Sequence, residues 1–281
     1  MKKVMRTMGE MSLRGKIALA ICVVFILIAI FANVLAVHPY DKISGKKFEA
    51  PSLSHPLGTN DLGIDIWAQM CSGARISLGI GVSVALVSSL IGGIAGLTAA
   101  FYSKRADTIL MTICNILQAV PDVPIIIVLA AFFGRNMYVM VLTLALLTWT
   151  NTARVIRARA LAFKKIPYVK LSLSYGASFF HIFKEHLFWE IWPLWMISFA
   201  QLVGKAVVME ATMAFLGLGD PTVKSWGIIL NNALNYRGIY YTDYWKWWIV
   251  PPVIAIALLV TSLSTLVAEF EKMSGMKGAH G

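Results

Sequence analysis

Three ionisable residues stand within long apolar stretches of this 281-residue chain. They are Asp122, Lys205 and Glu210. An ionised side chain in the hydrocarbon core of a membrane rarely faces lipid, and it usually lines a pathway or pairs with another group. The three residues are therefore candidates for a pathway that carries a polar solute across a membrane.

Asp122 has a specific local setting, because it lies between Pro121 and Pro124. It stands roughly 22 Å into its apolar stretch, at about 1.5 Å per helical residue. Prolines interrupt the hydrogen bonding of a helix, and an acid beside the interruption can accept the freed amide hydrogens. The sequence leaves two roles open for Asp122, a pathway residue and a local cap.

Lys205 and Glu210 are five residues apart, so they point about 140° away from each other on an α-helix and do not form a same-face pair. Each needs its own partner on another helix, on a second subunit or in water. A structural ion pair at a subunit interface is as good an interpretation for Lys205 as a pathway role. Glu210 is expected near the outer end of its span, within reach of the membrane interface.

Catalysis within the membrane would need a nucleophile with a base, or a cluster of metal ligands, inside the spans. The three cysteines are far apart and have no metal or redox spacing. All five histidines lie outside the predicted spans: His38, His55, His181, His186 and His280. We therefore expect no catalytic residue, no cofactor and no metal site.

The composition restricts the class of protein to which the chain can belong. The chain is 58% apolar and 14% charged, with a mean hydropathy of +0.72. These values exclude a soluble enzyme domain and a disordered chain, because too few charges are present to cover a water-facing surface. The net charge of +11 fits cytoplasmic loops better than a surface for nucleic acid, so no nucleic-acid partner is expected.

The apolar stretches predict an all-α polytopic membrane protein with six transmembrane helices. The predicted spans are 17–37, 76–101, 109–133, 137–156, 193–215 and 248–270. Residues 61–72 are short and amphipathic, and we expect them to form an interfacial helix. Residues 1–75 would then hold an anchor span, an extracellular segment and this helix, and residues 76–281 the transmembrane domain.

The charge distribution predicts that both termini are cytoplasmic. With that orientation, 16 of the 25 Lys and Arg residues fall on the cytoplasmic side, 8 on the outer side and Lys205 within a span. This agrees with the positive-inside rule. The expected location is the cytoplasmic (inner) membrane, with the lipid bilayer around a multi-pass chain.

The longest cytoplasmic segment, about 154–190, predicts two short amphipathic helices separated by Gly176. They form a docking surface for a cytoplasmic partner or lie on lipid, and the residues leave both open. Gly176 is interpreted as a tight turn or an ordinary helix C-cap. His186 falls on the apolar face of the second helix and is expected to be a buried histidine satisfied by a loop carbonyl.

Four elements resemble permeases of ABC importers, and more narrowly the second permease of dipeptide, oligopeptide and nickel importers. The loop resembles the family's cytoplasmic coupling loop at Arg154–Leu161, Tyr168-Val169, Gly176-Ala177-Ser178 and His186. Residues 55–65, HPLGTNDLGID, resemble the family's HPLGTD-x-x-GRD. Residues 72–78, SGARISL, and the pair AFLGLG (214–219) and SWG (225–227) resemble two further elements, in the family's order and spacing.

The resemblance implies a non-catalytic permease subunit that forms half of a translocation pathway for peptides. Its implied partners are a homologous permease in a heterodimer, two cytoplasmic ATPase subunits that bind the ATP, and an extracytoplasmic substrate-binding protein. Nickel or a metal chelate is the alternative substrate. The implied ATPase-coupling residues are Tyr168, Val169, Lys170, Gly176, Ala177 and His186.

Three departures from the family pattern stand out. Lys170-Leu171-Ser172 replaces the usual Glu-Ala-Ala, Trp189 replaces a proline, and Ile64 replaces the arginine of GRD. Lys170 suggests a matching charge change on the ATPase. A channel or secondary transporter that works without ATP is a distant alternative; it would usually show inverted repeats, and none is convincing here.

Overall fold

The computed structural model describes residues 11–176 and 178–273, and this part of the chain is helical, with a single isolated bridge between Thr59 and Asp65. This agrees with the predicted all-α class. The helices are α2 (Leu13–Ile30), α3 (Ala32–Leu35), α4 (Ile66–Phe101), α5 (Lys104–Ala119), α6 (Asp122–Phe133), α7 (Met137–Lys164), α8 (Pro167–Ser174), α9 (Phe179–Ile182), the π-helix η1 (Phe183–Leu187), α10 (Phe188–Phe215), α11 (Trp226–Asn235), the 3₁₀-helix η2 (Ile239–Tyr241), α12 (Trp245–Trp248) and α13 (Val250–Met273).

Five helical segments of the described chain are long and apolar enough to cross a membrane. They are Leu13–Ile30, Ile66–Phe101, Met137–Lys164, Phe180–Phe215 and Trp245–Met273. The pair α5 and α6 is bent by 90° and makes a sixth span if the two helices count as one. The bend falls at Pro121, where the sequence predicts a broken helix.

Helix α4 is longer than predicted, because it absorbs the segment expected to form a separate interfacial helix. It runs for 36 residues, about 54 Å at 1.5 Å per residue. The side chain of Asp65 caps its start by accepting a hydrogen bond from the Trp67 amide at 2.9 Å. No proline interrupts the chain between Ile66 and Ile76. The prediction of a separate interfacial helix was therefore wrong, and the expected boundary at residue 75 falls inside α4.

The predicted second cytoplasmic helix is also not a separate element. From Phe180 to Phe215 the chain forms one helical segment, through η1 into α10. Helix α7 continues to Lys164, eight residues beyond the predicted end at residue 156. The irregular part of the predicted 154–190 loop is therefore confined to the turns on either side of α8.

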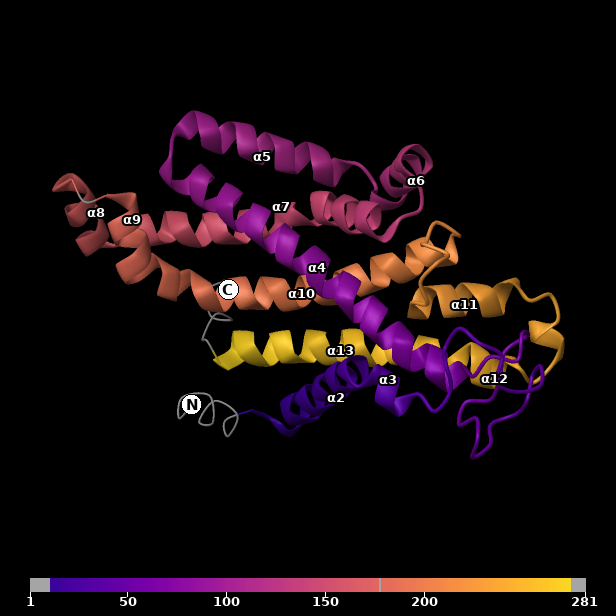
Figure 1. Ribbon diagram of the computed structural model, residues 1–281. Helices are drawn as coiled ribbons and strands as arrows, with labels where there is room; N and C mark the ends of the chain where they lie inside the picture. Colours follow the sequence, from indigo (N-terminus) through magenta and orange to yellow (C-terminus); the bar gives the residue numbers. More distant parts are fainter. Residues whose placement is uncertain (1–10, 177, 274–281) are drawn as a thin grey trace.

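Helix α4 crosses the middle of the bundle and packs closely on α7 and α10 (Figure 1). Small residues permit this contact. A Cβ atom on Gly92 or Gly96 would lie 2.5 Å from a backbone carbonyl oxygen of α7. The hydroxyls of Ser88 and Thr148 are hydrogen-bonded across the same contact at 2.7 Å.

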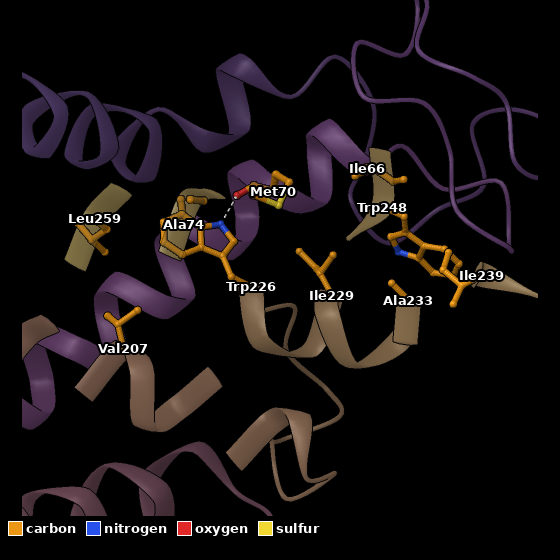
Figure 2. Packing of buried hydrophobic residues seen from close by; sticks show 11 residues of the cluster. Ile66, Met70, Ala74, Val207, Trp226, Ile229, Ala233, Ile239, Trp248 and Leu259 are labelled. Carbon is orange, nitrogen blue, oxygen red and sulfur yellow. Dashed lines mark hydrogen bonds between the residues drawn. The ribbon is translucent and has the colours of Figure 1, made fainter. Parts of the chain in front are cut away.

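The two ends of the bundle carry different elements. The start of α2, the end of α13, α8 and α9 lie at one end, and the 36–65 loop, α11 and α12 lie at the other (Figure 1). At the second end, a cluster of buried side chains surrounds Trp226 (Figure 2). The indole of Trp226 donates a hydrogen bond to the carbonyl of Met70 at 3.1 Å, which joins α11 to α4.

Candidate functional site

The structure brings together two of the three intramembrane candidates. The Nζ atom of Lys205, on α10, lies 3.4 Å from Oδ2 of Asp122, the first residue of α6. The two side chains are 41% and 38% exposed. Lys205 is about 15 Å from the end of α10 at Phe215, at 1.5 Å per residue. An ion pair therefore lies on the surface of the chain and well inside a span-length helix.

Further polar contacts join α5 to α7, and sequence reasoning missed them. The amide of Gln118 donates to Thr150 Oγ1 at 2.9 Å and to Asn151 Oδ1 at 3.0 Å. Arg154 donates to Asn115 Oδ1 at 2.7 Å. A signal was present, because Asn115 and Gln118, like Asn151 and Arg154, are three residues apart and share a helix face.

We define the polar strip as the six exposed or half-exposed residues that make these contacts on α5, α6, α7 and α10: Asn115, Gln118, Asp122, Asn151, Arg154 and Lys205. The exposed face of α4 around Leu86, Leu90 and Ile94 is apolar by contrast. Apolar faces suit lipid, whereas polar groups inside a span need water or protein around them. The polar strip is thus an intramembrane surface that needs water or protein around it.

Glu210 is placed differently from the prediction. It is 1% exposed, and it accepts hydrogen bonds from the hydroxyls of Ser225 at 2.5 Å and Ser77 at 3.3 Å. Ser77 in turn accepts a hydrogen bond from the Trp226 amide at 3.1 Å. Glu210 therefore joins α10 to α4 and to the start of α11, and the prediction that it reaches the membrane interface was wrong.

The glycine-rich segment between α10 and α11 is built for close packing. Gly217 has a φ of +74°, a conformation that glycine adopts without strain. A Cβ atom on Gly227 would lie 2.7 Å from the Cα atom of Ala211. These glycines bring α11 back against α10, which sets the position of Ser225.

Asp220 fixes the same segment to the start of α7. Its carboxylate accepts hydrogen bonds from the Met137 amide at 3.1 Å, the Thr222 amide at 2.9 Å and the Thr222 hydroxyl at 2.6 Å. Partial burial raises the pKa of Asp220, but the hydrogen bonds from Thr222 and Met137 outweigh burial and leave its pKa below the ordinary value.

At the opposite end, residues 165–187 form what we call the α8–α9 turn. Two buried side chains anchor it to the bundle, Val169 at 1% and Ile182 at 2% exposed. They pack in one cluster with Ile156, Phe163 and Leu187. Several large side chains of and beside the turn remain exposed: Tyr168, Leu171, Tyr175, Phe180 and Trp189. The turn therefore presents aromatic surface outward from a fixed base.

The predicted coupling residues occupy distinct positions in this turn. Val169 is an internal anchor, while Tyr168 and Lys170 are exposed. Gly176 has a φ of +84°, and a Cβ atom added there would meet nothing within 4 Å. The backbone conformation, not lack of space, therefore favours glycine. Ala177 lies outside the described residues, as does the side chain of Phe179.

His186 is exposed, so the prediction of a buried histidine was wrong. Its ring lies edge-on to Tyr168, with centroids 5.6 Å apart. The reason is η1, because a π-helical turn pairs residues five apart. Ile182 and Leu187 therefore share the buried side, whereas the predicted α-helical spacing places His186 beside Ile182.

Polar contacts tie the end of α7, from which the turn begins, to the neighbouring spans. Lys164 donates to the carbonyl of Ala100 at 2.8 Å, at the end of α4. Arg159 pairs with Glu190, and Arg157 donates from Nη2 to Asp107 of α5 at 2.6 Å. The α8–α9 turn is continuous with α7 and α10, so a force on it would reach α4 and α5 through these contacts of α7.

Comparison with known proteins identifies a family and several relatives. Residues 73–272 match the family described as binding-protein-dependent transport system inner membrane component. The oligopeptide transport system permease protein OppC of Bacillus subtilis is 33% identical over 220 residues, covering 78% of this chain and 72% of that protein. The dipeptide permease DppC of the same organism is 31% identical, covering 77% and 67%.

A third relative and a solved structure complete the comparison. The glutathione transport system permease protein GsiD of Pectobacterium atrosepticum is 34% identical, covering 69% of this chain and 64% of that protein. An inward-facing structure of the MetNI methionine ABC transporter matches 70% of this chain and 94% of its own, with a TM-score of 0.54 and 17% identity. That structural match concerns the fold alone.

Proposed function

The chain belongs to the binding-protein-dependent transport system inner membrane components and is a multi-pass inner membrane protein; on this premise we propose that it is the permease subunit of an ATP-driven peptide importer. One observation carries the substrate class. Relatives named as oligopeptide and dipeptide permeases align with more than three quarters of the chain at 31–33% identity.

The proposed topology has six spans, with α5 and α6 together forming the third. The α8–α9 turn and both termini face the cytoplasm, and the 36–65 loop, α11 and α12 face outward. Two observations support this orientation. The start of α2, the end of α13 and the turn share one end of the bundle, and most Lys and Arg residues fall on that side.

The polar strip is proposed to face a central pathway shared with a homologous permease in a heterodimer. The half-exposed Asp122–Lys205 pair supports this role, because such a pair is costly against lipid. Gln118 and Asn151 extend the polar surface along α5 and α7. A polar, flexible peptide needs hydrogen-bonding groups along its route, and these side chains supply both donors and acceptors.

The α8–α9 turn is proposed to dock onto a cytoplasmic ATPase, one of two that bind ATP. The chain itself would be non-catalytic and hold no cofactor. Exposed Tyr175 and Phe180 offer aromatic contacts of the kind that anchor protein interfaces. ATP-driven closure of the ATPases would move the turn and with it α7, whose contacts with Asp107 and Ala100 would shift the spans between inward and outward access.

Coupling is tested by Gly176→Val in the complete complex with its second permease, ATPases and binding protein. The left-handed backbone strains valine by about 1–3 kcal/mol. We expect assembly to persist, while ATP hydrolysis per complex no longer rises with peptide-loaded binding protein. Gly134→Val is a matched control, because Gly134 also has a positive φ (+83°) and open space around it, in the α6–α7 turn.

Equal stimulation of ATP hydrolysis in the two variants would contradict the coupling role. Lys170→Glu tests the suggested charge match on the ATPase, and unchanged transport and hydrolysis in that variant would remove that suggestion. Delivery of labelled dipeptides and oligopeptides into proteoliposomes tests the substrate class.

A further inference from the structure

Three metal-binding side chains that are distant in sequence meet in the 36–65 loop. His38 follows α3, His55 lies in the middle of the loop, and Asp65 is the residue that caps α4. One ligand atom from each lies within 4.8 Å of the other two. The loop is at the end of the bundle opposite the α8–α9 turn (Figure 1), so the cluster is separate from the polar strip and from the proposed ATPase surface.

The inner atoms of this cluster are buried and lack partners. His55 is 4% and Asp65 is 0% exposed. Among the described residues, neither Nδ1 of His55 nor Oδ2 of Asp65 has a hydrogen-bond partner, and the two atoms are 3.7 Å apart. The other oxygen of Asp65 is engaged by the Trp67 amide. Buried polar atoms are rarely left unsatisfied, and an ion between them is one physical explanation.

Each of the two rings lies near an oxygen of the kind that orients a metal-binding histidine. One ring nitrogen of a metal-bound histidine usually donates to a carboxylate or a carbonyl, which orients the ring. Nε2 of His55 lies 3.7 Å from Oε2 of Glu49, and Nε2 of His38 lies 3.2 Å from the Ser54 carbonyl oxygen. Glu49 is itself held by the Lys46 amide at 3.0 Å.

We propose that His38, His55 and Asp65 bind a divalent first-row transition metal ion, with Zn²⁺ as the best fit. Two imidazoles and one carboxylate form a ligand set that zinc accepts, and water completes the coordination. Zinc bonds of about 2.0–2.1 Å place tetrahedral ligands roughly 3.3 Å apart. The His55–Asp65 pair, 3.7 Å apart, must therefore close by about 0.4 Å, and His38 by at most about 1.5 Å. Half-exposed His38 at the edge of the cluster has room to move.

The bound ion would join the segment just after α3 to the N-cap residue of α4. The chain between them contains no helix, and it depends on turns at Gly58 and Gly63, both with positive φ. A cross-link over this length stabilises the folded loop by restricting the unfolded chain. Binding to the folded state alone also raises the melting temperature with metal concentration.

The test uses the full-length chain in detergent, purified with a histidine-free affinity tag and stripped with EDTA. Equilibrium dialysis against ZnCl₂ should give one Zn²⁺ per chain, and added Zn²⁺ should raise the melting temperature. His38→Ala removes a ligand from the edge of the cluster. Asp65→Asn removes the second carboxylate oxygen and keeps an acceptor for Trp67. Each should weaken binding by more than the about 10- to 100-fold that an outer partner such as Glu49→Gln costs.

His181→Ala is the matched control, because His181 is exposed on α9 at the other end of the bundle; it should bind Zn²⁺ like the wild type. Binding that is unchanged in His38→Ala and Asp65→Asn would overturn the site, as would the absence of Zn²⁺ binding at micromolar metal. Unfolding in the absence of metal does not obscure the result, because the melting temperature of every variant is measured with and without Zn²⁺.

Discussion

Asp122 and Glu210 are both carboxylates in span-forming helices, and their surroundings are opposite. Asp122 begins a helix at a break, is half exposed and faces Lys205. Glu210 lies inside the continuous helix α10, is 1% exposed and receives two serine hydroxyls. The hydrogen bonding and burial of Glu210 are provided by its own chain. Asp122 is left half exposed, so water or another subunit must cover it. The burial of an intramembrane acid therefore indicates its role: a buried acid is structural, and a half-exposed acid is a candidate for the pathway.

The energetic consequence follows from burial. Removing an acceptor from buried hydroxyls leaves donors that water cannot reach, and this carries the full desolvation penalty. An ion pair in which both side chains are partly exposed contributes little to the free energy of unfolding, because water can solvate each charge when the pair is broken. We therefore expect changes at Glu210 to affect stability, and changes at Asp122 and Lys205 to affect transport.

The largest effect is expected for Glu210→Leu. It leaves the hydroxyls of Ser77 and Ser225 without their acceptor, at about 1–3 kcal/mol for each buried donor. The unfolding free energy should fall by roughly 2–6 kcal/mol, measured as a lower melting temperature and lower yield of the monodisperse chain in detergent.

Glu210→Gln is the control for that change, because its amide oxygen can still accept a serine hydroxyl; it should be clearly more stable than Glu210→Leu. If Glu210→Leu has the melting temperature of the wild type, the proposed difference between a structural Glu210 and a transport-related Asp122 is wrong.

The second effect is expected in transport. Asp122→Asn should assemble and melt like the wild type but leave Lys205 as an unpaired charge at the polar strip. We expect transport in proteoliposomes to fall about fivefold or more, equivalent to roughly 1 kcal/mol in the barrier.

The double variant Asp122→Asn with Lys205→Gln removes both charges and sharpens the test. It should transport better than Asp122→Asn alone, because no unpaired charge remains. Wild-type transport in all three proteins would return the pair to a structural role, which is the alternative that the sequence leaves open.

Local signals explain what the sequence could predict. Pro121 marks the break between α5 and α6, and Gly176 marks the left-handed turn, since both depend on the backbone preferences of one residue. The apolar stretches located the spans because burial in lipid is a property of composition. These features required no knowledge of what lies nearby.

Most of what sequence reasoning missed depends on contact between distant segments. Asp122 meets Lys205 across 83 positions of the sequence, and His38 meets Asp65 across a loop without periodicity. The burial of Glu210 depends on Ser77 and Ser225 from two other elements. The exposure of His186 depends on a π-helical turn, which a 3.6-residue period cannot predict.

The smallest effect is expected at Asp220. It tests whether burial or the number of hydrogen bonds determines how much each acid contributes to stability. Asp220 accepts three described hydrogen bonds, one more than Glu210, but it lies outside the spans. Its pKa is lowered in the folded chain from the ordinary value of 3.8. Its charge therefore stabilises the fold above that ordinary value, and this contribution is lost as the pH falls through the folded-state pKa.

Asp220→Asn removes that titration and keeps an oxygen that can accept from Thr222 and Met137. We expect melting temperatures close to the wild type at pH 7, with the wild type losing more stability than the variant as the pH falls below about 4. The measurement is the difference between the two melting temperatures at pH 7, 5 and 3.5. Asp220→Asn could instead lower the melting temperature at pH 7 as far as Glu210→Leu does. In that case the number of hydrogen bonds matters more than burial, and it alone must explain the difference between Glu210 and Asp122.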